Sequence, residues 1–207
     1  MKLLTVLFTL LLSQASFALG PLDGEATIEW WNTELSDNVF DGDIDAGTLN
    51  LNAQGWWDQG WGIQGGISLS DSSSGQFEDQ QRFNFNLNRY LFSPTDNTYI
   101  SAGLGWENIQ LKSGDSTNGL RLSLRGQIGF IGLASLYGQS TWLPTLGDTN
   151  DFSNISGTEF ETGIVFEPLP FISLKAGYRR FKLDYDFSGS TGGTTSSGFI
   201  LGTGIHW

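Results

Sequence analysis

The chain has one histidine, His206, and no cysteine, so few of its side chains are suited to acid–base or nucleophilic catalysis. A catalytic histidine works with a nucleophile and an orienting carboxylate within hydrogen-bond reach. His206 is the next-to-last residue, and the sequence contains no Gly-x-Ser-x-Gly motif. The sequence therefore predicts no catalytic residues and no enzyme.

An acidic stretch, "DGDIDAG", has the alternating aspartates that begin a calcium loop, at Asp41, Asp43 and Asp45. In an EF-hand the glycine stands at position 6 and a bidentate glutamate at position 12. Here Gly47 comes one position late, and Asn52 stands where the glutamate belongs. A solvated acidic loop is the better interpretation, and we expect neither a metal nor a cofactor.

Other charged residues recur at alternate positions of strand-like segments, on the face opposite the apolar residues. Five are acidic and five basic: Glu25, Glu29, Arg82, Glu107, Arg121, Arg125, Glu159, Glu161, Lys175 and Arg179. If these strands close into a narrow barrel, all ten project into the lumen, where unpaired charges are costly. The pattern predicts a network of paired charges in the lumen.

The first 18 residues have the features of a secretory signal peptide. Lys2 is followed by an apolar run from Leu3 to Leu12 and by the small residues Ser16 and Ala18. This pattern predicts export with cleavage after Ala18, and the mature residues 19–207 suit one domain. With Lys2 removed, the mature chain keeps 9 basic and 22 acidic residues, a balance unsuited to nucleic acid.

Period-2 alternation, many glycines and the lack of long apolar runs predict an all-β protein. The expected strands are residues 24–34, 44–55, 61–70, 80–91, 98–111, 119–130, 132–143, 157–167, 171–183 and 198–207. A soluble sandwich shares this alternation. The connections, however, alternate between long polar segments such as "SDSSSGQFED" or "DFSGSTGGTTSS" and short ones such as "FIG". Such alternation is typical of transmembrane antiparallel up-and-down barrels, here with about ten strands or, as the alternative, eight.

Aromatic residues gather at the strand ends that adjoin the short connections, as in the interfacial girdles of membrane barrels. We expect this role in membrane anchoring and assembly for Trp56, Trp57, Trp61, Phe171 and Trp207. The last strand, "GFILGTGIHW", places Phe199, Leu201, Thr203, Ile205 and Trp207 on one face.

The signal peptide, the even number of alternating strands and the terminal "GIHW" resemble Gram-negative outer-membrane β-barrel proteins. In that class the last strand ends on an aromatic residue that the barrel assembly machinery reads. The segments "LYGQSTWLP" and "ETGIVFEPLPFISLKAGYRRFKLDYD" further resemble small barrels of the YfaZ type, a family that implies no defined activity. The resemblance implies an outer-membrane location.

Three functions stay open. The first is a non-enzymatic barrel, structural or interactive through acidic external loops. The second is a small porin-like channel for ions or small solutes. The third, a lipid- or peptide-modifying enzyme, is disfavoured, because outer-membrane lipases, lipid A deacylases and omptin-like proteases place a histidine on specific strands. Expected partners are outer-membrane lipids, including lipopolysaccharide, and the assembly machinery; Arg180 and Lys182 stand near the external end, within reach of lipid phosphates.

Overall fold

A computed structural model describes residues 23–37, 43–57, 60–72, 81–95, 97–110, 115–149, 151–187 and 189–207. Each strand there alternates between apolar and polar or small residues, so each has one face for lipid and one for the interior. The ten strands are β1 (Asp23–Asp37), β2 (Asp43–Trp57), β3 (Trp61–Ser72), β4 (Gln81–Thr95), β5 (Thr98–Gln110), β6 (Ser116–Ile131), β7 (Ala134–Leu143), β8 (Phe152–Leu169), β9 (Ile172–Phe187) and β10 (Ser190–His206). No helix in these ranges is long and apolar enough to span a membrane.

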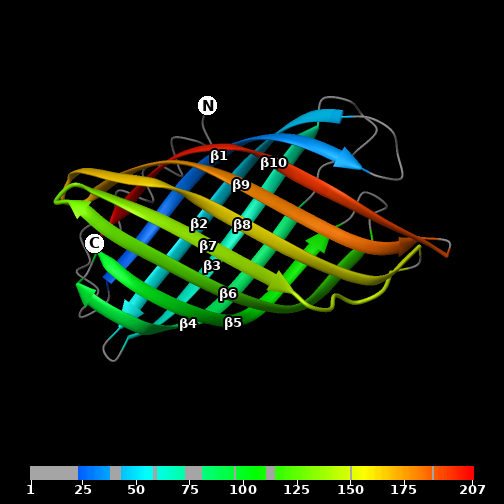
Figure 1. The fold of residues 1–207 in the computed structure, drawn as a ribbon, viewed down its shortest axis with the longest axis horizontal. Helices are drawn as coiled ribbons and strands as arrows, with labels where there is room; N and C mark the ends of the chain where they lie inside the picture. Colours follow the sequence, from blue (N-terminus) through cyan, green and yellow to red (C-terminus); the bar gives the residue numbers. More distant parts are fainter. Residues whose placement is uncertain are drawn as a thin grey trace, which may run out of the picture.

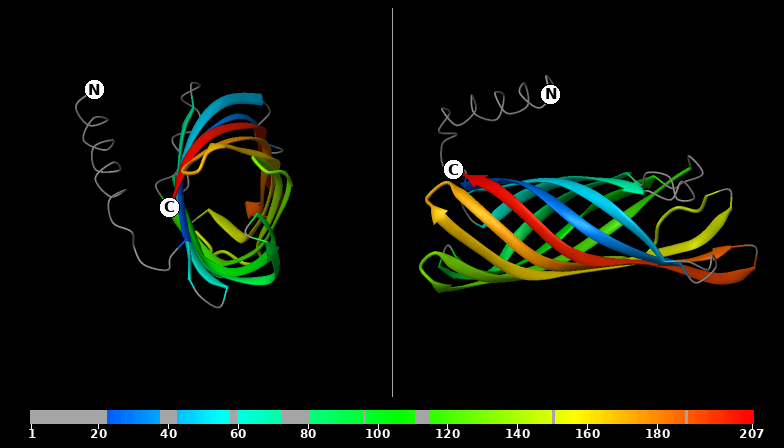
Figure 2. Two further views of the ribbon diagram at one scale, coloured as in Figure 1. Left: turned by 90° about the vertical axis from the view of Figure 1, so that its left-hand side faces the viewer. Right: turned by 90° about the horizontal axis from the view of Figure 1, so that it is seen from above.

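The strands form one closed antiparallel barrel in which each strand pairs with its neighbours in sequence and β1 pairs with β10. Figure 1 shows the tilted strands, and the end-on view in Figure 2 shows the closed ring. The closing register runs from Glu25↔His206 to Asp37↔Thr194. Closure gives the backbone hydrogen-bonding groups partners without disulfides or an exposed sheet edge within the lipid.

The outer surface is an apolar belt, because the large exposed side chains of every strand point away from the barrel axis. Examples are Ile28, Phe85, Leu104 and Leu174, all more than a third exposed. A bilayer core needs about 9–11 residues of a tilted strand, and strands of 15 to 18 residues such as β1 and β8 exceed that length. The C-terminus and the short turns share one end of the barrel (Figure 2). Short turns mark the periplasmic end of such barrels, so the long connections are external.

One predicted loop is wrong. The segment 186–197 was expected to be a long external connection, but β9 and β10 stay paired out to Phe187↔Ser190. Gly189 has a φ of 82°, which lets the chain reverse tightly there. The result is a hairpin that projects at the external end (Figure 1), with residues Ser190–Gly193 beyond the last pair with β1.

Candidate functional site

The lumen contains all ten predicted charged residues, and most of them form one connected network. Its centre is Glu107, which is fully buried and forms ion pairs with both Arg82 and Arg121. Arg82 also reaches across the lumen to Glu159 at 2.6 Å. Because each partner comes from a different strand, the network ties β4, β5, β6 and β8 together through the interior.

A second group of pairs joins β1, β8 and β9. Lys175 Nζ lies 2.5 Å from Glu29 and 2.7 Å from Glu161. Arg179 lies 2.9 Å from Glu29 and 2.5 Å from Glu161, and its Nε is 3.6 Å from Glu159, which links the two groups. Buried charges are tolerated when they are paired in this way, and removal of one partner leaves the other uncompensated.

Arg125 and Glu25, the other two predicted charged residues, are connected through a neutral side chain. Arg125 donates to Gln54 Oε1 at 2.6 Å, and Gln54 Nε2 donates to Glu25 at 2.8 Å. Ser173 Oγ also donates to Glu25, at 3.1 Å. The Gln54 carboxamide therefore bridges the two charges, so this end of the lumen is balanced without a direct ion pair between them.

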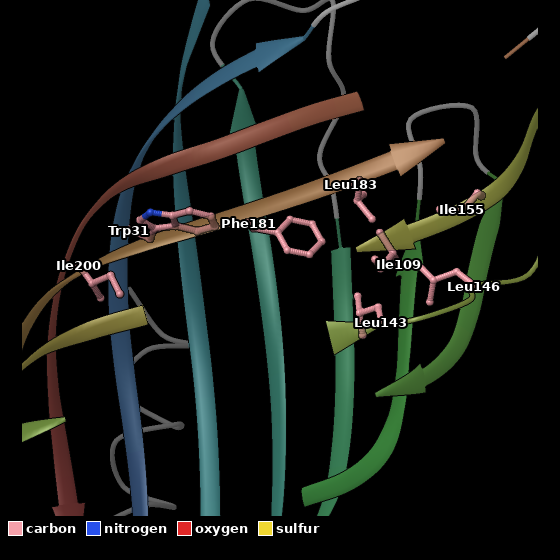
Figure 3. Packing of buried hydrophobic residues seen from close by; sticks show 8 residues of the cluster. All are labelled: Trp31, Ile109, Leu143, Leu146, Ile155, Phe181, Leu183 and Ile200. Carbon is pink, nitrogen blue, oxygen red and sulfur yellow. The ribbon is translucent and has the colours of Figure 1, made fainter. Parts of the chain in front are cut away.

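An apolar layer covers the network on its external side. Eight buried residues form it: Trp31, Ile109, Leu143, Leu146, Ile155, Phe181, Leu183 and Ile200. Figure 3 shows Phe181 between Trp31 and the group around Leu183. The Arg82 guanidinium lies 3.8 Å from the Phe181 ring centroid, so the layer rests directly on the charges.

Leu146 reaches this layer from the connection between β7 and β8. Residues 144–149 of that connection fold over the barrel mouth, where Leu146 N donates to Ile155 O at 2.8 Å and Gly147 N to Asn118 O at 2.8 Å. A Cβ at Gly119 would overlap the Thr145 carbonyl oxygen, so only glycine allows this close approach. We call residues 144–149 the lid segment.

The inward apolar residues were not predicted, although the sequence held a signal. Trp31, Ile109 and Ile200 stand on inward rows that are otherwise mostly polar, small or charged. Arg180 and Lys182, whose facing the sequence left ambiguous, point outward, and Lys182 pairs with Asp184 at 2.7 Å.

At the periplasmic end, four of the five residues predicted for the aromatic girdle face outward and one faces the lumen. Trp57, Phe171 and Trp207 are exposed, and Trp61 faces outward beneath the Arg89 guanidinium at 4.9 Å. Trp56 differs from the prediction: it is only 8% exposed, against 37% for Trp57, and stacks on Tyr90 at 3.9 Å inside the barrel. Tyr99 is buried beside them. Neighbours in a strand face opposite sides, so only one of the adjacent tryptophans can contact lipid.

His206 faces the lumen opposite Glu25 in the β1–β10 register. The Glu25 carboxylate accepts from Ser173 and Gln54, and no hydrogen bond joins His206 to Ser173 among the residues that the structure describes. Within the same ranges, no group of three or more histidine and carboxylate side chains is arranged to hold a metal. Of the predicted acidic loop 41–47, Asp41 lies outside the described residues, but Asp43 and Asp45 belong to β2 and pair with Ser36 and Glu34 of β1, so the loop prediction is wrong for them. The signal peptide also lies outside the described residues.

No protein-family model matches the sequence, and no curated protein matches it either. The likeness to the YfaZ type therefore stays a prediction. In fold, the chain is similar to the outer membrane protease OmpT from Escherichia coli, with a TM-score of 0.51 and 10% identity over 91% of this chain and 93% of that one. Neisserial surface protein A gives a TM-score of 0.47 and 12% identity over 91% and 98% of the two chains. The translocator domain of the autotransporter NalP from Neisseria meningitidis gives 0.43 and 9% over 100% and 95%.

At these identities the comparisons concern the fold alone, and the OmpT likeness is the one that carries it. Together with the closed ten-strand ring and the outward apolar belt, this likeness identifies the architecture. The chain is a Gram-negative outer-membrane β-barrel in fold, and its belt places it in the outer membrane.

Proposed function

We propose that this barrel is non-enzymatic, is closed to ions, and acts through its acidic external end as a structural or interaction module. The observation that carries the proposal is the obstruction of the lumen by paired charges beneath an apolar layer. An ion entering would have to leave water and separate these pairs, which is strongly unfavourable in a narrow interior.

The distribution of charge supports the external end as the interaction face. The lumen balances five acidic residues with five basic ones, so the mature chain's excess of carboxylates lies elsewhere. Most of it belongs to the external connections and strand ends, as in Glu34, Asp148, Asp151, Asp184 and Asp186. Hydrogen bonds from Asn154 and Thr191 lower the pKa of the Asp186 carboxyl, so it stays charged to a lower pH than an ordinary aspartate. We expect a partner at this end to carry positive charge.

Two further partners belong to the proposal. Arg180 points outward and is exposed, just beyond the apolar Tyr178 of β9, where we expect it to reach lipopolysaccharide phosphates. Trp207 exchanges backbone hydrogen bonds with Gly24 at 3.0 and 3.1 Å and so completes the last strand that the assembly machinery is expected to read.

Planar-bilayer recording of the purified protein tests the ion-tight barrel. We expect at most small and infrequent conductance steps. Steady, large conductance from the unmodified protein would reject the proposal in favour of the second candidate, a small channel. The observation that favours this candidate is a polar cavity in the lumen, which residues of the charge network line together with uncharged polar side chains such as Asn50, Asn52 and Ser68.

A further inference from the structure

Arg125 differs from the other basic residues of the lumen, because it forms no ion pair with any residue that the structure describes. The others each pair with at least one glutamate: Arg82, Arg121, Lys175 and Arg179. Arg125 Nη1 donates to the neutral Gln54 at 2.6 Å, and its Nε is buried without a hydrogen-bond partner among the described residues. A guanidinium has five N–H donors, and a buried donor left unpaired is unfavourable. Arg125 therefore keeps both a positive charge and a donor that the described chain does not use.

Glu25 does not supply the missing countercharge. Its carboxylate accepts from Gln54 Nε2 at 2.8 Å and from Ser173 Oγ at 3.1 Å, and the Gln54 carboxamide separates it from the guanidinium. The carboxylate thus has two neutral donors, whereas the guanidinium has one neutral acceptor. Of the two charges, Arg125 is the less satisfied.

Arg125 lines the polar cavity of the lumen, which offers about 50 Å³ to the centres of water molecules. That volume holds roughly three to five waters. Five basic and four acidic residues of the charge network line this cavity, because Glu107 is fully buried and is not part of its wall. Basic side chains therefore outnumber acidic ones on the cavity wall.

Two other residues on the cavity wall carry buried polar atoms without a hydrogen-bond partner among the described residues. Asn50 is 1% exposed, and its unpaired atom is the donor Nδ2. The unpaired atom of Asn84 is the acceptor Oδ1, which a water molecule can satisfy. Together with Arg125 Nε, the wall has two unused donors and one unused acceptor. Unpaired buried groups of this kind indicate that something outside the chain satisfies them.

The guanidinium is held in place and can be reached from the periplasmic end. It lies 5.9 Å from the ring centroid of Tyr99. β6 runs from Ser116 toward the short turn after Ile131, so Arg125 is nearer the periplasm than Arg121. Arg125 is partly exposed, whereas Arg121 is 3% exposed. An ion from the periplasm therefore meets Arg125 before it meets the paired charges, and the apolar layer lies beyond them.

We propose that Arg125 and the cavity beside it bind a small monovalent anion, such as chloride or acetate, that enters from the periplasm. An anion supplies Nε with a charge-assisted hydrogen bond and gives the guanidinium a countercharge. A cation would face this guanidinium and donors of the wrong polarity, and the small volume excludes large anions. The site goes beyond the proposed function, since an anion that binds at Arg125 does not have to cross the charge network.

Bromide replaces chloride in the first test, because its anomalous scattering identifies it in crystals of the purified protein grown or soaked in sodium bromide. We expect a bromide ion within about 3.5 Å of Arg125 Nε. Arg125→Gln, which keeps a polar side chain but removes the charge, should lose this ion. Arg180→Gln removes an exposed, outward arginine and should keep it.

The second test measures binding in lipid vesicles through stability. An anion that binds only the folded barrel stabilises it, so the urea midpoint should be higher in sodium chloride than in sodium gluconate of equal ionic strength. Arg125→Gln should abolish this difference, and Arg180→Gln should preserve it. Glu25→Gln keeps the hydrogen-bonding shape but removes a repelling carboxylate. We expect it to lower the chloride concentration of half-maximal effect by about threefold or more, and this gain does not require Arg125→Gln to fold.

Bromide found only on the outer surface, a chloride effect that survives Arg125→Gln, or an unchanged chloride affinity in Glu25→Gln would each overturn the inference. Ion conductance is recorded on the same samples. Steady, large conductance with bromide at Arg125 would reject the ion-tight barrel but keep the anion site. Silent bilayers without a chloride effect would keep the barrel and reject the site.

Discussion

Arg82 and Glu159 stand 77 positions apart in the sequence and meet across the lumen at 2.6 Å, joining β4 to β8. Neighbouring strands are already joined by backbone hydrogen bonds, but these two strands are not neighbours in the ring. The ion pair therefore connects opposite walls of the barrel. We expect this connection to stabilise the barrel against changes in the shape of its cross-section. The network around it leads to the first prediction.

Arg121 and Arg125 share one strand and face the same lumen but have different partners. Arg121 pairs with the fully buried Glu107, whereas Arg125 bonds to neutral Gln54. We expect Arg121→Ala to lower the free energy of unfolding by about 3–5 kcal/mol, because it leaves a buried carboxylate partly uncompensated. Arg125→Ala should cost about 1–3 kcal/mol, as for an unpaired neutral group. Urea unfolding in lipid vesicles, followed by tryptophan fluorescence, measures both; equal costs would contradict the assignment of partners.

The proposal that the barrel is not an enzyme makes a prediction at His206. Because no described nucleophile bonds to this side chain and the facing Glu25 carboxylate is occupied by Ser173 and Gln54, His206→Ala should insert and migrate on gels as the unmodified protein does. Purified protein is assayed for esterase and protease activity in parallel. An activity that disappears in His206→Ala would show that the proposal is mistaken.

Trp207 lies over Gly24 at the seam between the last and first strands. A Cβ at Gly24 would overlap the indole, whereas one at Gly55, its cross-strand partner, would meet nothing within 4 Å. We expect Gly24→Val and deletion of Trp207 each to lower the folded fraction in the outer membrane severalfold, and Gly55→Val to leave it near normal. Membrane fractionation with heat-dependent gel mobility reports the folded fraction. Normal levels of the truncated chain would mean that the terminal residue has no role in assembly.

The lid segment gives a prediction on exposure. Leu146 is 1% exposed, so a Leu146→Cys reporter should react slowly with thiol reagents. Adding Gly119→Ala should displace residues 144–149 and raise the rate by about tenfold or more, because the new methyl group and the Thr145 carbonyl cannot share one position. Gly126→Ala is the control on the same strand, since its Cβ would lie 3.8 Å from the nearest atom. Similar rates in the two double variants would show that Gly119 does not hold the lid.

Much of this architecture could be predicted from the sequence. In a closed membrane barrel every strand has one face toward lipid and one toward the lumen, so apolar residues alternate with polar or small ones along each strand. The ten strands, the inward charges and the two kinds of connection follow from that alternation. The extended β9–β10 hairpin could not be predicted, since Ser190–Gly193 has no apolar contrast and its strand conformation comes from pairing with Tyr185, Phe187 and their neighbours.

The errors of facing have a related cause. Composition suggested lipid for both Trp56 and Trp57, but the alternation of β2 puts Trp56 on the polar row of Thr48 and Trp57 on the apolar row of Leu49. The apolar layer could not be predicted, because single large apolar residues on inward rows break the alternation of their own strand, and only the closed barrel brings them into contact. The partners within the charge network depend on distances across the lumen, which no local pattern contains.

The seam from Glu25↔His206 to Asp37↔Thr194 joins the first strand, β1, to the last, β10. Folding therefore cannot be completed from one terminus to the other, because the first strand must wait, unpaired on one side, until the last has been delivered. Contacts of such long sequence separation form slowly, and every incomplete intermediate has two open edges and a half-wrapped apolar surface. We therefore expect the chain to need protection of its open edges and apolar surface until its last strand has paired with its first.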